Sequence, residues 1–275
     1  MHTDTLIVLP CYNEAGNIAR LVADLHKAAP GAHLLIIDDS SPDGTGAIAD
    51  ELAAAHADVK VVHRAGKQGL GSAHIHGLNH AIEGGYVNVV TMDCDYTHKP
   101  TDVVKLLAAL DDQQADMAAG SRYTHPDGVR DWPLWRQVIS RTAHVCTTHV
   151  LGIPFDATSA FRAYRTSALR RVPFKDIRGD GYSFVFEMIF TCMREGLRIA
   201  EVPLEMPIRQ AGESKISNME IVRALVALFR LGSARLSGEV KLRTTMRPPA
   251  EAGSKKKVTA RRSPRASVDS HLSSP

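Results

Sequence analysis

Short apolar runs alternate with amphipathic segments through the first half of the chain. The runs have the length of buried strands, and the segments between them repeat apolar residues with the period of an α-helix. Strand followed by helix, repeated four times, predicts right-handed crossovers and a mostly parallel sheet with helices on both faces. The expected strands are residues 5–10, 33–38, 59–63, 87–93 and 115–122, and the expected helices are residues 14–29, 44–56, 70–83 and 101–111.

The second half is less regular. Its pattern predicts a helix at 132–150, a strand at 160–164, a helix at 183–195, a strand at 198–209 and a helix at 218–236. From about residue 245 the composition turns to Pro, Ser, Lys and Arg with little to bury, which predicts a disordered tail. We therefore expect three parts: one α/β domain over 1–216, a helical extension over 217–244 and a basic tail over 245–275.

The distribution of charge separates the tail from the rest of the chain. The whole sequence has 33 basic and 30 acidic residues, and the part from Lys241 onward holds nine of the basic and two of the acidic ones. The remaining part has 33 − 9 = 24 basic and 30 − 2 = 28 acidic residues, a net charge of −4. This balance argues against nucleic-acid binding by the main domain.

Membrane-spanning and disulfide-bonded classes find no support either. The sequence has no apolar run of about 18 residues, and its first residues lack the features of a signal peptide. Its four cysteines are scattered, with no CxxC pair and no histidine cluster at zinc spacing. We expect reduced thiols in a cytosolic protein and no metal held by cysteine.

Polar motifs follow the expected strands at the points where they end. They are PCYNE after the first strand, DDSSPDG after the second, DCD after the fourth and GSR after the fifth. In α/β sheets of this kind, ligands bind beyond the carboxyl ends of the strands. The sequence therefore predicts one site at that edge.

Two carboxylates one residue apart are the strongest chemical signal. Residues two apart at the end of a strand project to the same side, so Asp93 and Asp95 can converge on one small volume. They repel each other unless a cation lies between them, and hard oxygen ligands suit Mg²⁺ or Mn²⁺. The alternative is an Asp-rich turn that caps the next helix.

The first-strand motif offers groups for a nucleoside. An aromatic ring and an acid beside a proline, as in Pro10, Tyr12 and Glu14, can stack on and hydrogen-bond such a ligand. The alternative is an ordinary turn in which Asn13 is the helix N-cap.

The second-strand motif carries the acids of a ribose contact. Asp38 and Asp39 stand where α/β nucleotide folds place an acid on a ribose hydroxyl, whereas Asp43 and Gly44 have the pattern of a turn and a cap. The chain has no GxGxxG or Walker A loop. A diphosphate must then be neutralised by metal and arginine.

Eight motifs occur in an order that resembles a known family. They are LPCYNE, IIDDSSPDGT, KQGLGSAHIHG, MDCDYTH, GSRY, DATSAFRAYR, GYSFVFEM and RQAGESKIS, over roughly residues 5–218. The order resembles family-2 glycosyltransferases with the GT-A (Rossmann-like) fold, and is most similar to dolichol- or polyprenol-phosphate mannose synthases. The QxxRW motif of processive synthases is absent.

This resemblance implies transfer of mannose from GDP-mannose to a polyprenyl or dolichyl phosphate, with inversion at the anomeric carbon and a bound Mg²⁺ or Mn²⁺. It implies that the nucleoside is held by Pro10, Tyr12, Glu14, Ile37 and Asp39. It implies that the diphosphate and sugar meet Asp93, Cys94 and Asp95, with the two aspartates on the metal and Thr97 as a further candidate ligand.

The same resemblance assigns the basic residues. Arg122 and Arg209 clamp phosphates with Lys215 beyond them, and the acceptor phosphate meets Arg136 and Ser140, one helical turn apart. The residues implied in catalysis are Asp95, Arg122 and Arg136. Ala160 replaces an expected glycine, which predicts local strain.

A lipid acceptor requires contact with a membrane. Ser217, just before the predicted helix at 218–236, and Glu220 in its first turn have the pattern of a capping box that starts the helix. One face carries Ile221, Leu225, Leu228, Phe229 and Leu236, opposite Arg223 and Arg230. This pattern predicts peripheral binding at the cytoplasmic face of a membrane, assisted by the basic tail. The alternatives are a helix packed on the domain, or a membrane-embedded partner subunit that recruits the chain.

Other assignments stay open on the sequence alone. The donor can instead be UDP-glucose or a UDP-N-acetylhexosamine, and a noncatalytic nucleotide-sugar-binding regulator is a third hypothesis. We expect His98 to pack under the site. Glu187, in an apolar helix, is partnered either in the site or by a neighbouring loop.

Overall fold

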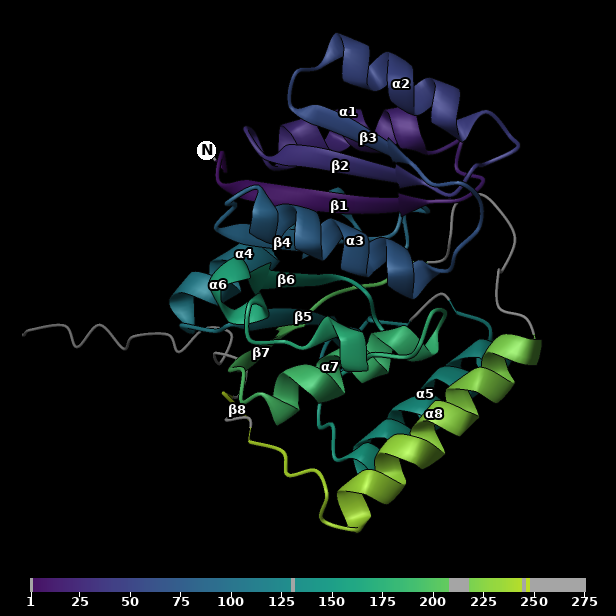
Figure 1. Cartoon of the computed structure of the whole chain (residues 1–275), viewed down its shortest axis with the longest axis vertical. Helices are drawn as coiled ribbons and strands as arrows, with labels where there is room; N and C mark the ends of the chain where they lie inside the picture. The colour runs from purple at the N-terminus through teal and green to yellow at the C-terminus, as the bar shows by residue number, and fades with distance from the viewer. Residues whose placement is uncertain (1, 130–131, 208–217, 244–245, 248–275) are drawn as a thin grey trace, which may run out of the picture.

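The computed structural model describes residues 2–129, 132–207, 218–243 and 246–247. A single eight-stranded sheet crosses these parts of the chain in the order β3-β2-β1-β4-β6-β5-β7-β8 (Figure 1). The strands are β1 (Thr5–Cys11), β2 (His33–Asp38), β3 (Val59–His63), β4 (Asn88–Thr91), β5 (Met117–Ser121), β6 (Arg162–Arg165), β7 (Ile199–Pro203) and β8 (Met246–Arg247). The helices are α1 (Ile18–Ala28), α2 (Thr45–Ala55), α3 (Leu70–Glu83), α4 (Val103–Asp112), α5 (Leu134–Leu151), α6 (Thr166–Leu169), α7 (Ser183–Arg194) and α8 (Asn218–Leu236), with 3₁₀ turns η1 (Pro100–Asp102) and η2 (Phe174–Asp176).

The sheet is mostly parallel, as the alternating pattern predicts. Strands β3, β2, β1 and β4 are parallel neighbours, and β5, β7 and β8 are parallel as well. Strand β6 runs antiparallel between β4 and β5. From β1 the chain continues to β2 and β3 on one side and returns to β4 on the other. The carboxyl ends of β1 and β4 therefore form a switch point of the kind at which α/β sheets bind ligands.

Alternation along β1 builds a core on each face of the sheet. Leu6 and Val8 pack with α3 and α7, whereas Ile7 and Leu9 pack with α1 and α4. Because successive side chains of a strand point to opposite faces, a continuous apolar run serves both cores. The two cores together fix the carboxyl ends of β1 and β4, where the candidate site lies.

Helix α1 begins later than its pattern predicts. It starts at Ile18 rather than near residue 14, and Asn17 is the residue that precedes it. Asn13 has a left-handed φ of 57°, and its N–H donates to the Ser41 hydroxyl at 3.0 Å. The interpretation of Asn13 as helix N-cap is therefore wrong, because loop-to-loop hydrogen bonds hold it outside the helix. The assignment of Gly44 as a cap is confirmed, since it precedes α2 with a φ of 90°.

Two further expectations are settled by local contacts. Ala160 is not among the described non-glycine residues with positive φ, so the expected strain at that position is wrong. Glu187 accepts from the Arg178 N–H at 3.0 Å and pairs with Arg230 of α8 at 2.7 Å. Its partners are thus a neighbouring loop and a helix rather than the strand-end site.

Helix α8 packs against the domain beside α5 and α7 (Figure 1). Ala227 is buried there, and Arg235 donates to the carbonyl oxygens of His149 and Val150 at the end of α5. At the other end of α8, the Glu220 carboxylate accepts from the Tyr182 N–H at 2.9 Å. Ser217, the other half of the predicted capping box, lies outside the described residues, as does most of the predicted tail.

Candidate active site

The loops after β1 and β4 lie side by side at the switch point. Val8 and Thr91 are paired in register, so Cys11 and Cys94, each three residues further on, come next to each other with their Sγ atoms 3.1 Å apart. The hydrogen bond to Cys11 and burial raise the pKa of the Cys94 thiol. Because Cys94 is only 1% exposed, a substrate contact at this residue has to come from its backbone.

The acidic loop is held by its own polar contacts. Asp95 is 2% exposed, and its carboxylate accepts from the Thr97 N–H at 3.0 Å and from the Thr97 hydroxyl at 2.6 Å. Asp93 is half-buried, and its N–H donates to Nδ1 of His98 at 3.0 Å. Thr97 thus orients the Asp95 carboxylate, and its predicted role as a metal ligand stays a prediction.

His98 packs under the site, as expected from the sequence. It is 4% exposed and stacks on Phe161 with ring centroids 4.7 Å apart. Burial lowers the pKa of His98 to about 4, although the charge of Asp95 acts in the opposite direction. The imidazole is therefore neutral near pH 7 and can accept the hydrogen bond that holds the Asp93 backbone.

A buried ion pair joins the end of β5 to the loop before β6. Arg122 donates through Nε to the Asp156 carboxylate at 2.8 Å, and Asp156 has no exposed surface. Burial disfavours the ionised form of Asp156, but Arg122 and Thr158 outweigh it and lower its pKa. The Nε group of Arg122 is therefore occupied by Asp156. A phosphate that binds Arg122 has to contact the terminal nitrogens of the guanidinium. Arg122 was a predicted site residue, whereas Asp156 was present only as part of the DATSAFRAYR motif.

Trp132 brings two arginines of the prediction together. The guanidinium carbon of Arg136 lies 4.0 Å from the centroid of this ring, and that of Arg122 lies 5.2 Å from it. The indole N–H donates to the Met206 carbonyl at 2.9 Å, which fixes the ring. Both distances are in the range of cation–π attraction. The DWPLWR segment contained this signal, but the sequence alone does not say which groups reach the ring.

Ser140 lies on α5 one turn after Arg136, as predicted. Its hydroxyl is 2.6 Å from the Tyr123 hydroxyl, and Tyr123 stacks on His144 with ring centroids 4.2 Å apart. This contact ties α5 to the segment after β5. An acceptor phosphate that binds the Ser140 hydroxyl would therefore share it with Tyr123 or displace that contact.

Tyr182 was not among the predicted site residues. Burial raises its pKa, and the charges of Arg122, Asp156, Asp93 and Arg136 act on it as well. Its hydroxyl lies 3.5 Å from the Thr158 carbonyl oxygen, in the loop that also carries Asp156. The GYSFVFEM motif contains it, and a tyrosine beside glycine before an apolar helix was the available signal.

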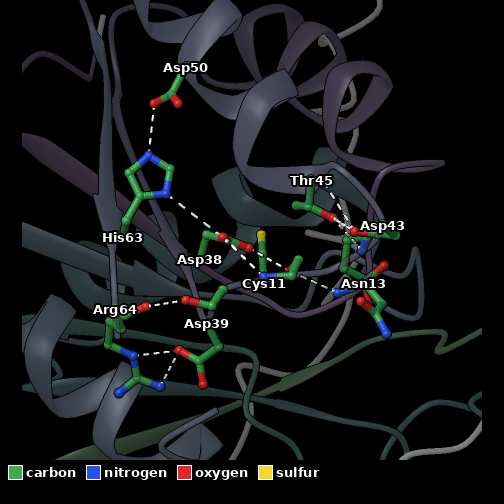
Figure 2. Close-up of polar contacts among 12 residues, drawn as sticks. Cys11, Asn13, Asp38, Asp39, Asp43, Thr45, Asp50, His63 and Arg64 are labelled. Carbon is green, nitrogen blue, oxygen red and sulfur yellow. Dashed lines mark hydrogen bonds and ion pairs between the residues drawn. The ribbon is translucent and has the colours of Figure 1, made fainter. Parts of the chain in front are cut away.

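The predicted nucleoside loop is tied to the loop after β2 (Figure 2). The Glu14 N–H donates to the Thr45 hydroxyl at 2.9 Å, and the Ala15 N–H donates to Asp43 at 3.0 Å. The Glu14 carboxylate accepts from Asn17 at 2.8 Å, and Lys67 lies over the Tyr12 ring at 4.5 Å. These contacts fix the two loops relative to each other.

The two acids after β2 differ in their partners. Asp38 accepts from the Ser41 hydroxyl and lies 3.8 Å from Nδ1 of His63, whereas Asp39 pairs with Arg64 and accepts from the Gln68 N–H at 3.2 Å (Figure 2). Arg64 was not among the predicted residues. A ribose contact at Asp39 has to share its carboxylate with this ion pair.

The remaining predicted residues divide into placed and undescribed ones. Pro10 is half-buried in β1, one residue before Cys11. The side chain of Ile37 is fully buried in the core, so it can reach a nucleoside only through its backbone. Arg209 and Lys215 lie outside the described residues.

An apolar surface adjoins the site. Helices α5 and α8 lie next to each other (Figure 1) and expose large apolar side chains: Leu134, Trp135, Val138, Ile139 and Val145 on α5, and Met219, Ile221, Val222, Leu225, Val226, Phe229 and Leu236 on α8. We call this set the α5–α8 apolar face. Helix α8 thus packs inward on the domain and presents apolar residues outward. Within the described residues, no helix has both the length and the hydropathy of a membrane-spanning segment.

Comparisons with known proteins find relatives and a fold neighbour that cover most of this chain. The family model described as glycosyl transferase family 2 matches residues 6–176. The polyprenol monophosphomannose synthase of Mycolicibacterium smegmatis is 40% identical over 230 residues, which cover 83% of this chain and 86% of that protein. The undecaprenyl-phosphate mannosyltransferase of Micrococcus luteus is 38% identical over 230 residues, 83% of this chain and 94% of that protein. A crystal structure of a mycobacterial protein has the same fold, with a TM-score of 0.59 at 20% identity over 83% of this chain and 74% of that chain.

Proposed function

The chain belongs to glycosyl transferase family 2, and from that premise we propose that it transfers mannose from GDP-mannose to a polyprenyl monophosphate. The names of two relatives at 40% and 38% identity support the sugar and the acceptor. The observation that carries the proposal is the convergence of the acidic loop, the buried ion pair of Arg122 with Asp156, and Arg136 of α5 at one edge of the sheet. That edge offers groups for two anionic substrates.

The acidic loop fits a divalent ion. Asp93 and Asp95 supply only oxygen donors, and Thr97 orients the nearly buried carboxylate of Asp95. Such a donor set suits Mg²⁺ or Mn²⁺. When bound, the ion would neutralise the diphosphate and stabilise the departing GDP.

The donor side of the site is formed by the loops after β1 and β2. Tyr12 and Glu14 would hold the base and ribose from one loop, and Asp39 would do so from the other. Because hydrogen bonds already join these loops, donor binding needs little reorganisation. Arg122 and Tyr182 would then face the phosphates and the sugar.

The acceptor side is formed by α5. A lipid phosphate is largely deprotonated at neutral pH, since the second pKa of a phosphate monoester is about 6. It can therefore attack the anomeric carbon without a general base, and attack in line with the departing GDP inverts that carbon. Arg136 offsets the repulsion between the acceptor phosphate and the donor, and a guanidinium suits bidentate contact with phosphate.

The lipid tail of the acceptor would lie on the α5–α8 apolar face. Helix α5 carries Arg136, which contacts Trp132 at the site, and also the exposed side chains of Trp135, Val138 and Ile139. A phosphate group and its apolar chain can thus be bound by one helix. We infer that the protein binds peripherally to the cytoplasmic face of a membrane through this surface, either alone or with a membrane-embedded partner.

A donor panel tests the proposed reaction. Purified protein is incubated with a polyprenyl phosphate and radiolabelled GDP-mannose, UDP-glucose or UDP-N-acetylglucosamine, with Mg²⁺, Mn²⁺ or a chelator. We expect label in the organic extract from GDP-mannose, loss of it with the chelator, and a fall of about 100-fold or more in Asp95→Asn. Asp112→Asn, which changes an exposed acid in the last turn of α4, serves as the control.

Transfer from a UDP-sugar with none from GDP-mannose would overturn the choice of donor. Unchanged turnover in Asp95→Asn would overturn the role of the acidic loop. Donor binding without turnover under every metal condition would point to a regulatory protein instead.

A further inference from the structure

Two histidines and an aspartate meet at the edge of the sheet opposite the catalytic loops. His26 lies in the last turn of α1, His56 follows the last residue of α2, and Asp58 precedes the first residue of β3. One ligand atom of each lies within 4.8 Å of the others. Because strands β2 and β3 begin here, this His26–His56–Asp58 cluster is separate from the site at the carboxyl ends.

The backbone fixes two of the three residues. The His56 N–H donates to Leu52 at the end of α2, and its carbonyl accepts from Val59 at 3.1 Å. The Asp58 carbonyl accepts from the Leu34 N–H of β2 at 2.8 Å. The connection between α2 and β3 is therefore short and hydrogen-bonded at both ends, so it presents His56 and Asp58 in a defined geometry.

The third residue has an unsatisfied nitrogen. Nε2 of His26 is buried and has no hydrogen-bond partner. It lies 2.9 Å from the Asp58 carboxylate, so this contact has the distance of an ion pair without the direction of a hydrogen bond. A buried nitrogen without a hydrogen bond is unfavourable, unless another group binds to it.

The distances suit ligands that share one ion. Two ligand atoms on a tetrahedral zinc ion, with bonds of about 2.0 Å, lie about 3.3 Å apart. The His26–Asp58 distance of 2.9 Å is close to this value, and the rings of His26 and His56 are 4.8 Å apart at 55°. Since all three ligand atoms lie within 4.8 Å of one another, binding requires a side-chain rotation that brings the third ligand closer. His56 is partly exposed, so water can complete the coordination.

We propose that His26, His56 and Asp58 bind a divalent transition metal ion, with zinc as its probe, and that this ion clamps α1 to the α2–β3 connection. Two imidazoles and one carboxylate favour zinc and its neighbours over magnesium, whereas the acidic loop at Asp93 and Asp95 offers only oxygen. The two sites therefore differ in metal preference. The clamp stabilises the half of the sheet that carries the loops after β1 and β2.

The test uses the full chain, stripped with a chelator and then kept in excess Mg²⁺ so that the oxygen site does not report zinc. Zinc binding is measured by calorimetry and by the thermal midpoint, and Co²⁺ by its visible absorption. We expect one zinc per chain, a rise in the midpoint and a visible Co²⁺ spectrum. His56→Ala and Asp58→Asn should each weaken zinc binding at least about tenfold, which corresponds to about 1.4 kcal/mol.

Two controls make the result specific. His149→Ala removes an exposed histidine of α5 and should bind zinc like the unaltered chain. The double variant His76→Ala, His80→Ala removes two histidines one turn apart on α3, and should also retain the binding. The proposal is overturned if zinc does not bind in excess Mg²⁺, if His56→Ala and Asp58→Asn bind it unchanged, or if only the α3 double variant loses it.

Discussion

Asp156 is the buried carboxylate that allows Arg122 to be charged in the interior of the protein. It has no exposed surface, and Arg122, 7% exposed, is its ion-pair partner. Each charge is tolerated in the interior because the other is present, together with hydrogen bonds from Thr158. A lone buried charge would be strongly unfavourable. The placement of Arg122 at the site therefore depends on a residue 34 positions further along the chain.

At this scale we expect Asp156→Asn to be strongly destabilising. The substitution leaves Arg122 charged, buried and without its carboxylate, which should cost about 3–5 kcal/mol in the free energy of unfolding. Asp111→Asn is the matched control, because it removes the exposed ion pair with Arg165 and should cost about 0–1 kcal/mol. Urea unfolding at neutral pH measures both, and equal effects would contradict the role assigned to burial.

At the scale of elements, helix α5 combines two surfaces. Arg136 and Ser140 face groups of the site, and Trp135, Val138 and Ile139 are exposed. Helix α8 adds to the exposed side, although it is anchored inward by its contacts with Glu187 and with the end of α5. The amphipathic pattern predicted the apolar side of α8. It did not predict that α5 continues the same surface.

We expect charges on the α5–α8 apolar face to weaken vesicle binding. Full-length Trp135→Glu and Phe229→Glu should each lower the partition coefficient onto anionic liposomes by about tenfold or more, because burial of such a side chain contributes about 1.5–3 kcal/mol. Sedimentation with liposomes measures the bound fraction. Val87→Glu changes an exposed apolar residue at the amino end of β4 and should bind as before. Equal binding by all three variants would place the membrane contact elsewhere.

At the scale of the whole molecule, buried histidine links folding to pH. His74 lies on α3 and is 1% exposed. Its ring stacks on Phe184 of α7, with ring centroids 5.3 Å apart. Burial, followed by the charges of Arg162 and His98, lowers its pKa to about 3 from an ordinary value of 6.5. Between these two values the unfolded chain binds a proton that the folded chain does not. Stability therefore falls as the pH falls below about 6.5.

We expect His74→Leu to reduce this acid sensitivity. One histidine of this kind contributes up to about 1.4 kcal/mol per pH unit to the slope, and His98, with a pKa of about 4, contributes separately. Urea unfolding at a series of pH values between about 7 and 5 gives the slope for the parent chain, for His74→Leu and for His149→Leu as an exposed control. The assignment fails if His74→Leu and the control give the same slope as the parent.

The local pattern of the chain was sufficient for most of the elements. The strands β1 to β5 and the helices α2 to α5 lie within a few residues of their expected positions, because apolar period and turn residues act over short distances. The start of α1 was placed too early, because the N–H groups of Glu14 and Ala15 donate to Thr45 and Asp43 in the loop after β2 instead of belonging to the helix. The same pattern located the acidic and basic motifs at the strand ends.

By itself, then, the sequence determined the class of fold, the edge of the sheet at which the candidate site residues gather, and the resemblance to a family of glycosyltransferases. Only the tertiary structure decided which side chains meet: Asp156 with Arg122, Trp132 with two arginines, Tyr123 with Ser140, and His26 with His56 and Asp58. The reason is physical. Periodicity records which face of an element is buried, whereas a contact between distant residues depends on strand register and helix packing, which no local pattern contains.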